Sequence, residues 1–280
     1  MLPELIYREE KLHDYKLLAV LGALTGLIGF YLANLVFPSN IALTTVVFAA
    51  IPLVYPLTQF FLERERDGVS HIEELKVYLS LFTGQVVAFT GLGYVYPEKF
   101  DAQLLQFTDS ISGVDPTGQF FADSLFMSIF SNNITLFLMI FLVSVVIASA
   151  GAFVLTWNAS VMGVFFGQLL ATMPLSSEAL FVCTEEAVQE AGLANPSFLC
   201  YLPHAGFEMA GFIIAGITGS LMSASVYREH FGREIWEDYI LFLLLGAGFI
   251  VIGAALETGI LSVLIAGLTW STVLAYKILT

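Results

Sequence analysis

Apolar runs long enough to cross a lipid bilayer recur along the whole chain of 280 residues. The hydrocarbon core of a bilayer is about 30 Å thick, and an α-helix needs about 20 apolar residues to cross it. Because every backbone N–H and C=O in that core must be hydrogen-bonded internally, such runs form helices. The sequence therefore predicts an all-α, polytopic transmembrane helical bundle.

Eight runs are candidate spans. They are residues 17–37, 42–62, 77–97, 132–155, 157–173, 203–226, 239–256 and 260–277. The fifth run is short enough to be re-entrant, and the last two could be a single broken helix, so the expected count is six to eight. Hydrophobic residues make up 58% of the chain and charged residues 12%, which leaves too little polar sequence for a soluble domain.

We expect one membrane domain over residues 1–280. Its predicted segments are a cytoplasmic amphipathic segment (1–16), three N-terminal spans (17–97), an outer loop with an interfacial helix (98–131), a core (132–227) and a C-terminal hairpin (239–277). The interfacial helix is expected because Asp115-Pro116 resembles a helix start and FFADSLFMSIF follows it. An extension of the next span is the alternative for that stretch.

The basic residues predict how the chain is oriented in the cell membrane. With both termini in the cytoplasm, nine of the ten Lys and Arg residues lie on the inner side and only Lys99 lies outside. The formal net charge of −14 argues against a nucleic-acid partner. The mixed acidic and basic stretch 63–76 is interpreted as a solvated cytoplasmic connection, with a docking site for a cytosolic partner as the alternative, and His71 within it as a surface residue.

Both cysteines of the chain, Cys183 and Cys200, fall in the second outer loop, 174–202. That loop faces an oxidising compartment in this topology, where a disulfide can persist. We therefore expect a bridge between them, with two unpaired thiols as the alternative.

The sixth span carries two polar residues, His204 and Glu208, one helical turn apart after Pro203. Against lipid, either side chain would cost at least a few kcal/mol. Below them on the same stripe lies a ridge of small residues, which lets helix backbones approach closely in a membrane. The ridge is Gly211, Ala215 and Gly219. Both features predict that this face of the helix meets protein or a wet cavity.

Other polar residues are expected at the same depth. Asn132 and Asn133 begin the fourth span, and Glu257 ends the seventh, all on the outer side. With His204 and Glu208 they form a predicted polar cluster. The two asparagines are otherwise explained as helix caps, and Glu257 as part of a solvated turn. Asn158 is expected at the opposite face.

Several of these residues carry a family resemblance. The order of Ser131-Asn132-Asn133 heading a span, Trp157-Asn158 with Gly163 and Gly167 following, and the PHAGFE motif resembles the stage II sporulation protein M (SpoIIM) family over residues 120–227. The resemblance implies an integral membrane component that, in spore-forming bacteria, helps to hold cell-wall-degrading enzymes at the membrane. It also marks Asn132, Asn133, Asn158, His204 and Glu208 as motif positions.

Four interpretations of His204 and Glu208 remain open. They could lock neighbouring helices through hydrogen bonds, ligate zinc or another divalent metal, handle protons or ions, or bind a ligand such as a lipid headgroup. We favour a non-enzymatic scaffold or anchor that organises partner proteins, with no certain cofactor. The alternatives are a metal-dependent intramembrane hydrolase, or an ion- or proton-coupled channel or transporter. Expected partners are membrane lipids, a membrane or cell-envelope protein, and a second copy of the chain.

Overall fold

The computed structural model describes residues 14–67, 71–104, 122–147, 151–172, 202–229 and 232–258. Within these ranges there are seven long helices and no strand. The long helices are α3 (Tyr15–Val36), α4 (Ile41–Asp67), α5 (Ile72–Val95), α7 (Ala122–Val146), α8 (Gly151–Thr172), α10 (Leu202–Tyr227) and α11 (Arg233–Glu257). A short 3₁₀ turn, η1 (Pro97–Lys99), follows α5.

All seven long helices are apolar and long enough to span a membrane, which confirms the predicted class. The eighth predicted run, 260–277, and the amphipathic segment before Asp14 lie outside the described residues. α3 begins where the sequence supplies a cap, because the carboxylate of Asp14 accepts a hydrogen bond from the backbone N–H of Leu17. α11 ends at Glu257, where the sequence predicts the turn of the C-terminal hairpin.

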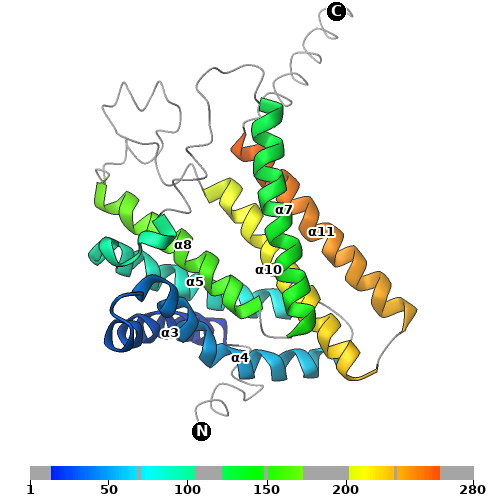
Figure 1. The fold of residues 1–280 in the computed structure, drawn as a ribbon. Helices are drawn as coiled ribbons and strands as arrows, with labels where there is room; N and C mark the ends of the chain where they lie inside the picture. The colour runs from blue at the N-terminus through cyan, green and yellow to red at the C-terminus, as the bar shows by residue number, and fades with distance from the viewer. Residues whose placement is uncertain are drawn as a thin grey trace, which may run out of the picture.

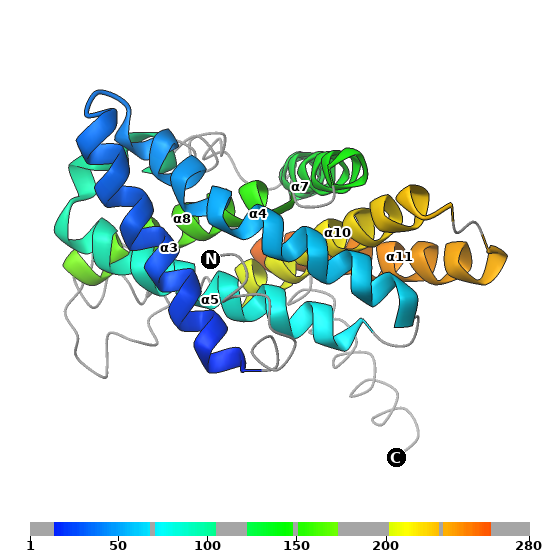
Figure 2. The ribbon, with the colours of Figure 1, turned by 90° about the horizontal axis from the view of Figure 1, so that it is seen from below.

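The helices form two groups that meet along α10 (Figures 1 and 2). In the first group α5 packs between α3 and α8, and α4 packs against α3. In the second group α10 packs against α7 and α11. α10 also contacts α4, α5 and α8, so it is the helix on which the two groups converge.

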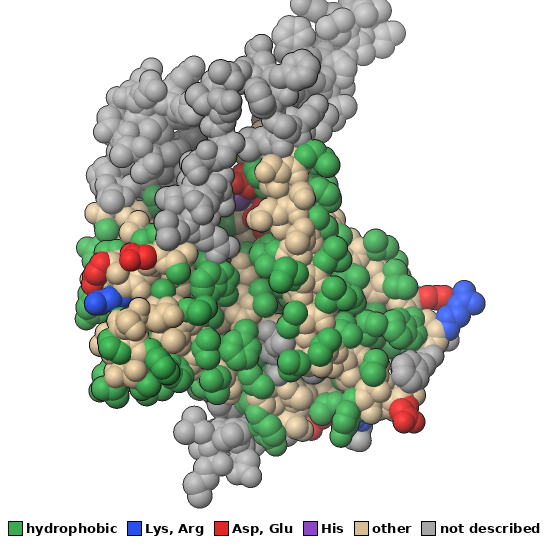
Figure 3. Space-filling model, in the orientation of Figure 1, with side chains coloured by type: hydrophobic (Ala, Val, Ile, Leu, Met, Phe, Trp, Pro, Cys, Tyr) green, Lys and Arg blue, Asp and Glu red, His purple; other side chains and the backbone are tan. Residues whose placement is uncertain are grey.

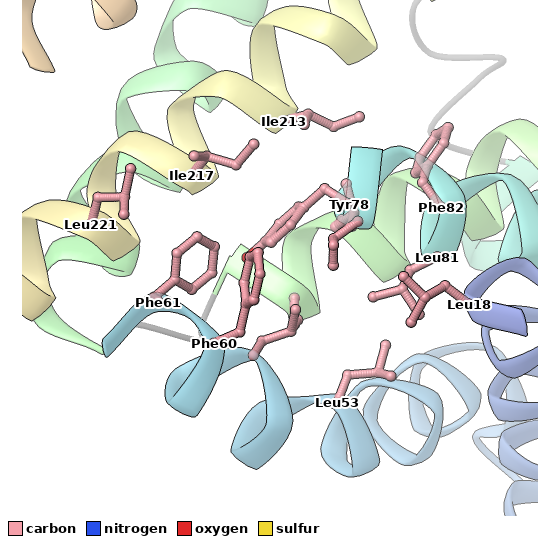
Figure 4. Packing of buried hydrophobic residues seen from close by; sticks show 14 of the residues in the cluster. Leu18, Leu53, Phe60, Phe61, Tyr78, Leu81, Phe82, Ile213, Ile217 and Leu221 are labelled. Carbon is pink, nitrogen blue, oxygen red and sulfur yellow. The ribbon is translucent and has the colours of Figure 1, made fainter. Parts of the chain in front are cut away.

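A buried apolar cluster joins the two groups (Figure 4). Phe61 of α4 and Tyr78 of α5 are fully buried, with ring centroids 5.6 Å apart. Ile213 and Ile217 of α10 complete this core and are also almost fully buried. Because lipid solvates the outer faces, this core is held by close packing more than by exclusion of water.

Small residues allow α3 and α5 to approach within backbone contact. A Cβ on Gly84 of α5 would overlap the carbonyl oxygen of Ala19, and one on Gly22 of α3 would overlap that of Leu81. Such contacts exclude any larger side chain at either position unless the helices separate. They place Gln85 of α5 in the interior, where its Nε2 donates to Oγ1 of Thr156 in α8 at 3.0 Å.

The predicted break between the fourth and fifth spans is wrong. α7 ends at Val146 and α8 begins at Gly151, so Trp157 lies inside α8. The stretch between the two helices, IASA, is small and apolar, so hydropathy gives no gap there. α8 is 22 residues long, which removes the reason for treating it as re-entrant.

The prediction of a separate interfacial helix over FFADSLFMSIF is wrong, and the alternative, an extension of the next span, is what the structure has. From Ala122 this stretch is the first part of α7, which continues unbroken to Val146. Asp115 and Pro116 lie outside the described residues. Asn132 and Asn133 therefore lie within α7 and do not cap it, because their backbone N–H groups are already inside the helix.

One end of the bundle gathers charged residues of both signs, and it is called the basic end here because most of the Lys and Arg residues in the described ranges lie there, although acidic residues outnumber them. It comprises the start of α3, the end of α4, the start of α5, the end of α10 and the start of α11. Arg64 pairs with Glu74 at 2.9 Å and Arg228 with Glu65 at 3.7 Å. The side chains of Glu65 and Glu74 are 0% and 3% exposed, so the prediction of a solvated connection is wrong for these two residues.

His71 at this end is also more than a surface residue. Its Nε2 lies 2.7 Å from Oδ2 of Asp238, which joins the start of α5 to α11. Its ring stacks on Phe242 with centroids 4.5 Å apart. The sequence shows these charges only as a polar stretch, because their pairing depends on helices far apart in the chain.

Candidate functional site: polar groups between α7, α10 and α11

The motif residues of α10 meet α7 near the end opposite the basic end. Asn133 of α7 donates from Nδ2 to Oε1 of Glu208 across 2.6 Å. Asn133 is 9% exposed, and Glu208 is partly buried. In a membrane a carboxylate and an amide are both costly to leave without a partner, so this hydrogen bond fixes how the two helices face each other.

α11 packs against the other side of the Glu208 side chain. A Cβ on Gly253 would lie 2.5 Å from Cγ of Glu208 and 3.3 Å from the backbone oxygen of His204. The absence of a side chain at Gly253 is therefore what lets α11 approach this turn of α10. Glu257 follows one turn later, and its carboxylate is near enough to interact electrostatically with that of Glu208.

Asn132 and Asn158 lie away from this contact. Asn132 is exposed on α7, although its neighbour Asn133 is buried. Asn158 is 7% exposed in α8, and its Nδ2 donates to the carbonyl oxygen of Val154 in the same helix at 2.8 Å. The structure thus brings Asn133, Glu208 and Glu257 to one place, with His204 on the adjoining turn.

The surroundings of these residues are amphipathic. Figure 3 shows acidic and histidine side chains together at the upper part of the molecule, next to a largely hydrophobic surface. His204 and Glu208 have intermediate exposure, and Glu257 is exposed. The group is therefore partly open, with Asn133 as its most buried member.

The small residues of α10 contact two different helices. A Cβ on Gly211 would lie 2.9 Å from the carbonyl oxygen of Gly246 in α11. A Cβ on Gly219 would lie 2.5 Å from the carbonyl oxygen of Phe141 in α7. Ala215 between them is 0% exposed. This face of α10 is thus shared between α11 and α7.

The metal and disulfide expectations receive no support. Among the described residues, no group of three or more His, Cys, Asp or Glu side chains is arranged to hold a metal ion. A zinc site needs at least three protein ligands, and His204, Glu208 and Glu257 are not arranged as such a set. Cys183 and Cys200 lie outside the described residues.

Polar contacts in the first helix group were not predicted. Gln103 is 1% exposed, and its Nε2 donates to Oγ of Ser160 and to the backbone oxygen of Ala42, both at 3.2 Å. Together with Gln85 it forms a second set of interhelical hydrogen bonds. The sequence signal for each contact is a lone glutamine within or beside an apolar run, which does not show the partner helix.

Seven membrane-length helices linked by buried polar contacts define a multi-pass helical membrane protein. The chain belongs to the stage II sporulation protein M family, whose model matches residues 18–260. The resemblance carried by residues 120–227 is therefore confirmed and extends over most of the chain. Neither a curated protein nor a solved structure matches the chain.

Proposed function

We propose that this protein is a non-enzymatic membrane scaffold that holds a membrane or cell-envelope protein partner. The observation that carries the proposal is the hydrogen bond from Asn133 to Glu208. This bond joins α7 to α10 through Glu208, a motif residue in an otherwise apolar helix. A scaffold needs such fixed contacts between its helices to present a constant surface to a partner.

The basic end supports the same interpretation. Ion pairs and hydrogen bonds connect five helix ends, so that α3, α4, α5, α10 and α11 are held together there. These contacts are Tyr15–Glu73, Arg64–Glu74, Arg228–Glu65, His71–Asp238 and Ser225–Tyr239. A bundle whose helices are connected at both ends can hold a bound partner in a fixed position without catalysing a reaction.

The test compares partner capture with stability. A photo-crosslinking residue at exposed Met127 of α7 would be used in cells, with mass spectrometry identifying the captured protein. We expect Glu208→Ala to reduce capture of that protein and to lower the unfolding temperature, whereas Asn132→Ala leaves both unchanged. Unaltered capture and melting in Glu208→Ala would contradict the proposal.

Ion or proton handling is a second candidate, because one observation favours it. Glu208 and Glu257 come from different helices, and their carboxylates are near enough to interact electrostatically. Two acidic groups in mutual electrostatic range can share a proton or attract a cation. A proton-flux assay in liposomes, with Glu208→Gln as the control, distinguishes the two functions, since a scaffold gives no flux in either form.

A further inference from the structure

Two buried hydroxyl groups meet where the two helix groups join. Tyr78 of α5 and Ser144 of α7 are both 0% exposed, and Tyr78 belongs to the apolar cluster of Figure 4. A Cβ on Gly151, the first residue of α8, would lie 2.8 Å from Oγ of Ser144 and 3.6 Å from Oη of Tyr78. Both hydroxyl groups therefore border the space beside Gly151, between α5, α7 and α8.

Neither hydroxyl oxygen has a hydrogen-bond partner within the described part of the chain. For Ser144 this differs from the usual pattern, because hydroxyl groups in these helices commonly donate to the carbonyl oxygen four residues earlier. Thr135 in the same helix donates to Ser131 in this way at 2.7 Å. Ser144 does not make the equivalent bond to Ile140, so its hydroxyl group is free to bind another partner.

The surroundings of the two hydroxyl groups offer a third polar group and some room. Ser220 of α10 lies near the Tyr78 hydroxyl, and its own hydroxyl donates to the carbonyl oxygen of Gly216 at 2.7 Å. The oxygen of Ser220 therefore keeps lone pairs that can accept a hydrogen bond. A Cβ on Gly216 would meet no atom closer than 3.7 Å, so the side of α10 that faces Gly151 is not tightly packed.

We propose that a water molecule binds beside Gly151 and bridges the hydroxyl groups of Tyr78 and Ser144. Buried polar groups in native proteins are almost always bonded to protein or to ordered water, and a buried water typically has about two to four polar partners. The lining consists of hydroxyl groups, aliphatic carbon atoms and glycine backbone, which suits a small neutral ligand. An ion in this lining would lack a compensating charge.

The bound water gives the two helix groups a hydrogen-bonded connection within their shared core. It joins α5 of the first group to α7 of the second, beside α8 and α10. The rest of this core consists of apolar side chains, which pack closely but have little directional preference. The water therefore helps to fix how the two groups are rotated against each other.

X-ray radiolytic footprinting of the full-length protein in detergent micelles tests the proposal. Hydroxyl radicals formed from a bound water oxidise the side chains beside it, including those that bulk water does not reach, and mass spectrometry locates the oxidised residues. We expect oxidation of Tyr78 and none of Phe89, an aromatic residue that is also 0% exposed. Ser144→Ala should reduce the oxidation of Tyr78, because the water loses one of its partners.

Gly151→Ala should abolish the oxidation of Tyr78, since its methyl group takes the position between the two hydroxyl groups. The variant should still fold, because the atom nearest to this methyl group is the rotatable Ser144 hydroxyl. Two control variants should leave the oxidation of Tyr78 unchanged. They are Tyr239→Phe, which removes a buried hydroxyl that bonds Ser225, and Gly248→Ala, which adds a methyl group with no atom within 4 Å.

Thermal unfolding supplies an independent measurement. Tyr78→Phe and Ser144→Ala should each lower Tm, and the double variant should melt no lower than the less stable single variant, because the loss of either hydroxyl already breaks the bridge. Three results would overturn the proposal: equal oxidation of Tyr78 and Phe89, unchanged oxidation of Tyr78 in a folded Gly151→Ala variant, or additive losses of Tm in the double variant.

Discussion

Gly253 of α11 lies directly against the Glu208 side chain of α10, so that a Cβ at Gly253 would lie 2.5 Å from Cγ of Glu208. The contact places α11 on one side of the carboxylate, while Asn133 of α7 bonds it from the other. Three helices therefore depend on one acidic residue for their relative position.

The first prediction concerns this close approach. Gly253→Ala should lower the free energy of unfolding by about 1 to 3 kcal/mol, because Glu208 must leave its rotamer or α11 must move outward. Gly248→Ala in the same helix should be neutral or slightly stabilising, since nothing lies within 4 Å and alanine favours helix. Thermal unfolding in detergent measures both, and equal behaviour of the two variants would contradict this view of the contact.

Neighbouring asparagines give the second prediction. Asn133→Ala should cost about 1 kcal/mol, the net value of a hydrogen bond whose loss leaves a partly buried carboxylate without its donor. Asn132→Ala should change the stability by less than about 0.5 kcal/mol, because Asn132 is exposed. Chemical denaturation in mixed micelles tests the pair, and a larger effect at Asn132 would reverse the assignment of the inward-facing residue.

The third prediction separates buried from exposed ion pairs at the basic end. Glu74→Gln should destabilise the protein by about 3 kcal/mol, since it removes the charge opposite Arg64 in a site where Glu74 is almost fully buried. Glu237→Gln should change it by about 0.5 kcal/mol or less, because the Arg233–Glu237 pair is exposed. Similar losses in the two variants would show that burial does not govern these pairs.

Orientation in the membrane gives the fourth prediction. In a variant without the native cysteines, a cysteine at Glu229 should react with a membrane-impermeant maleimide only after the cells are opened, and one at Lys99 should react in intact cells. The physical reason is the bias of basic residues toward the cytoplasmic side. Labelling of Glu229→Cys in intact cells would invert the topology.

The sequence predicted the helical class and the face of α10 well, because both follow from local properties. Pro203 marks the first turn of α10, and the spacing of His204 and Glu208 assigns them to one face. The α7–α8 boundary was missed because the residues around Gly151 are small and apolar, with neither charge nor proline to mark a turn.

Pairings between distant helices could not be derived in the same way. Nothing local in the sequence shows that Glu74 would be buried by Arg64, or that Asp238 would reach His71 across 167 positions. Asn132 and Asn133 were equivalent by motif, and only the rotation of α7 against α10 decides which of them bonds Glu208.

α10 is the most buried of the seven described spans, and this bears on biogenesis. α10 carries a histidine and a glutamate near its first turn and presents few large side chains to lipid. The free energy gained by moving this helix from the translocon into lipid without its neighbours is therefore small. Only four residues lie between the end of α10 at Tyr227 and Gly232, which precedes α11. We therefore expect the two helices to enter the bilayer as a hairpin, with α7 already present to receive them.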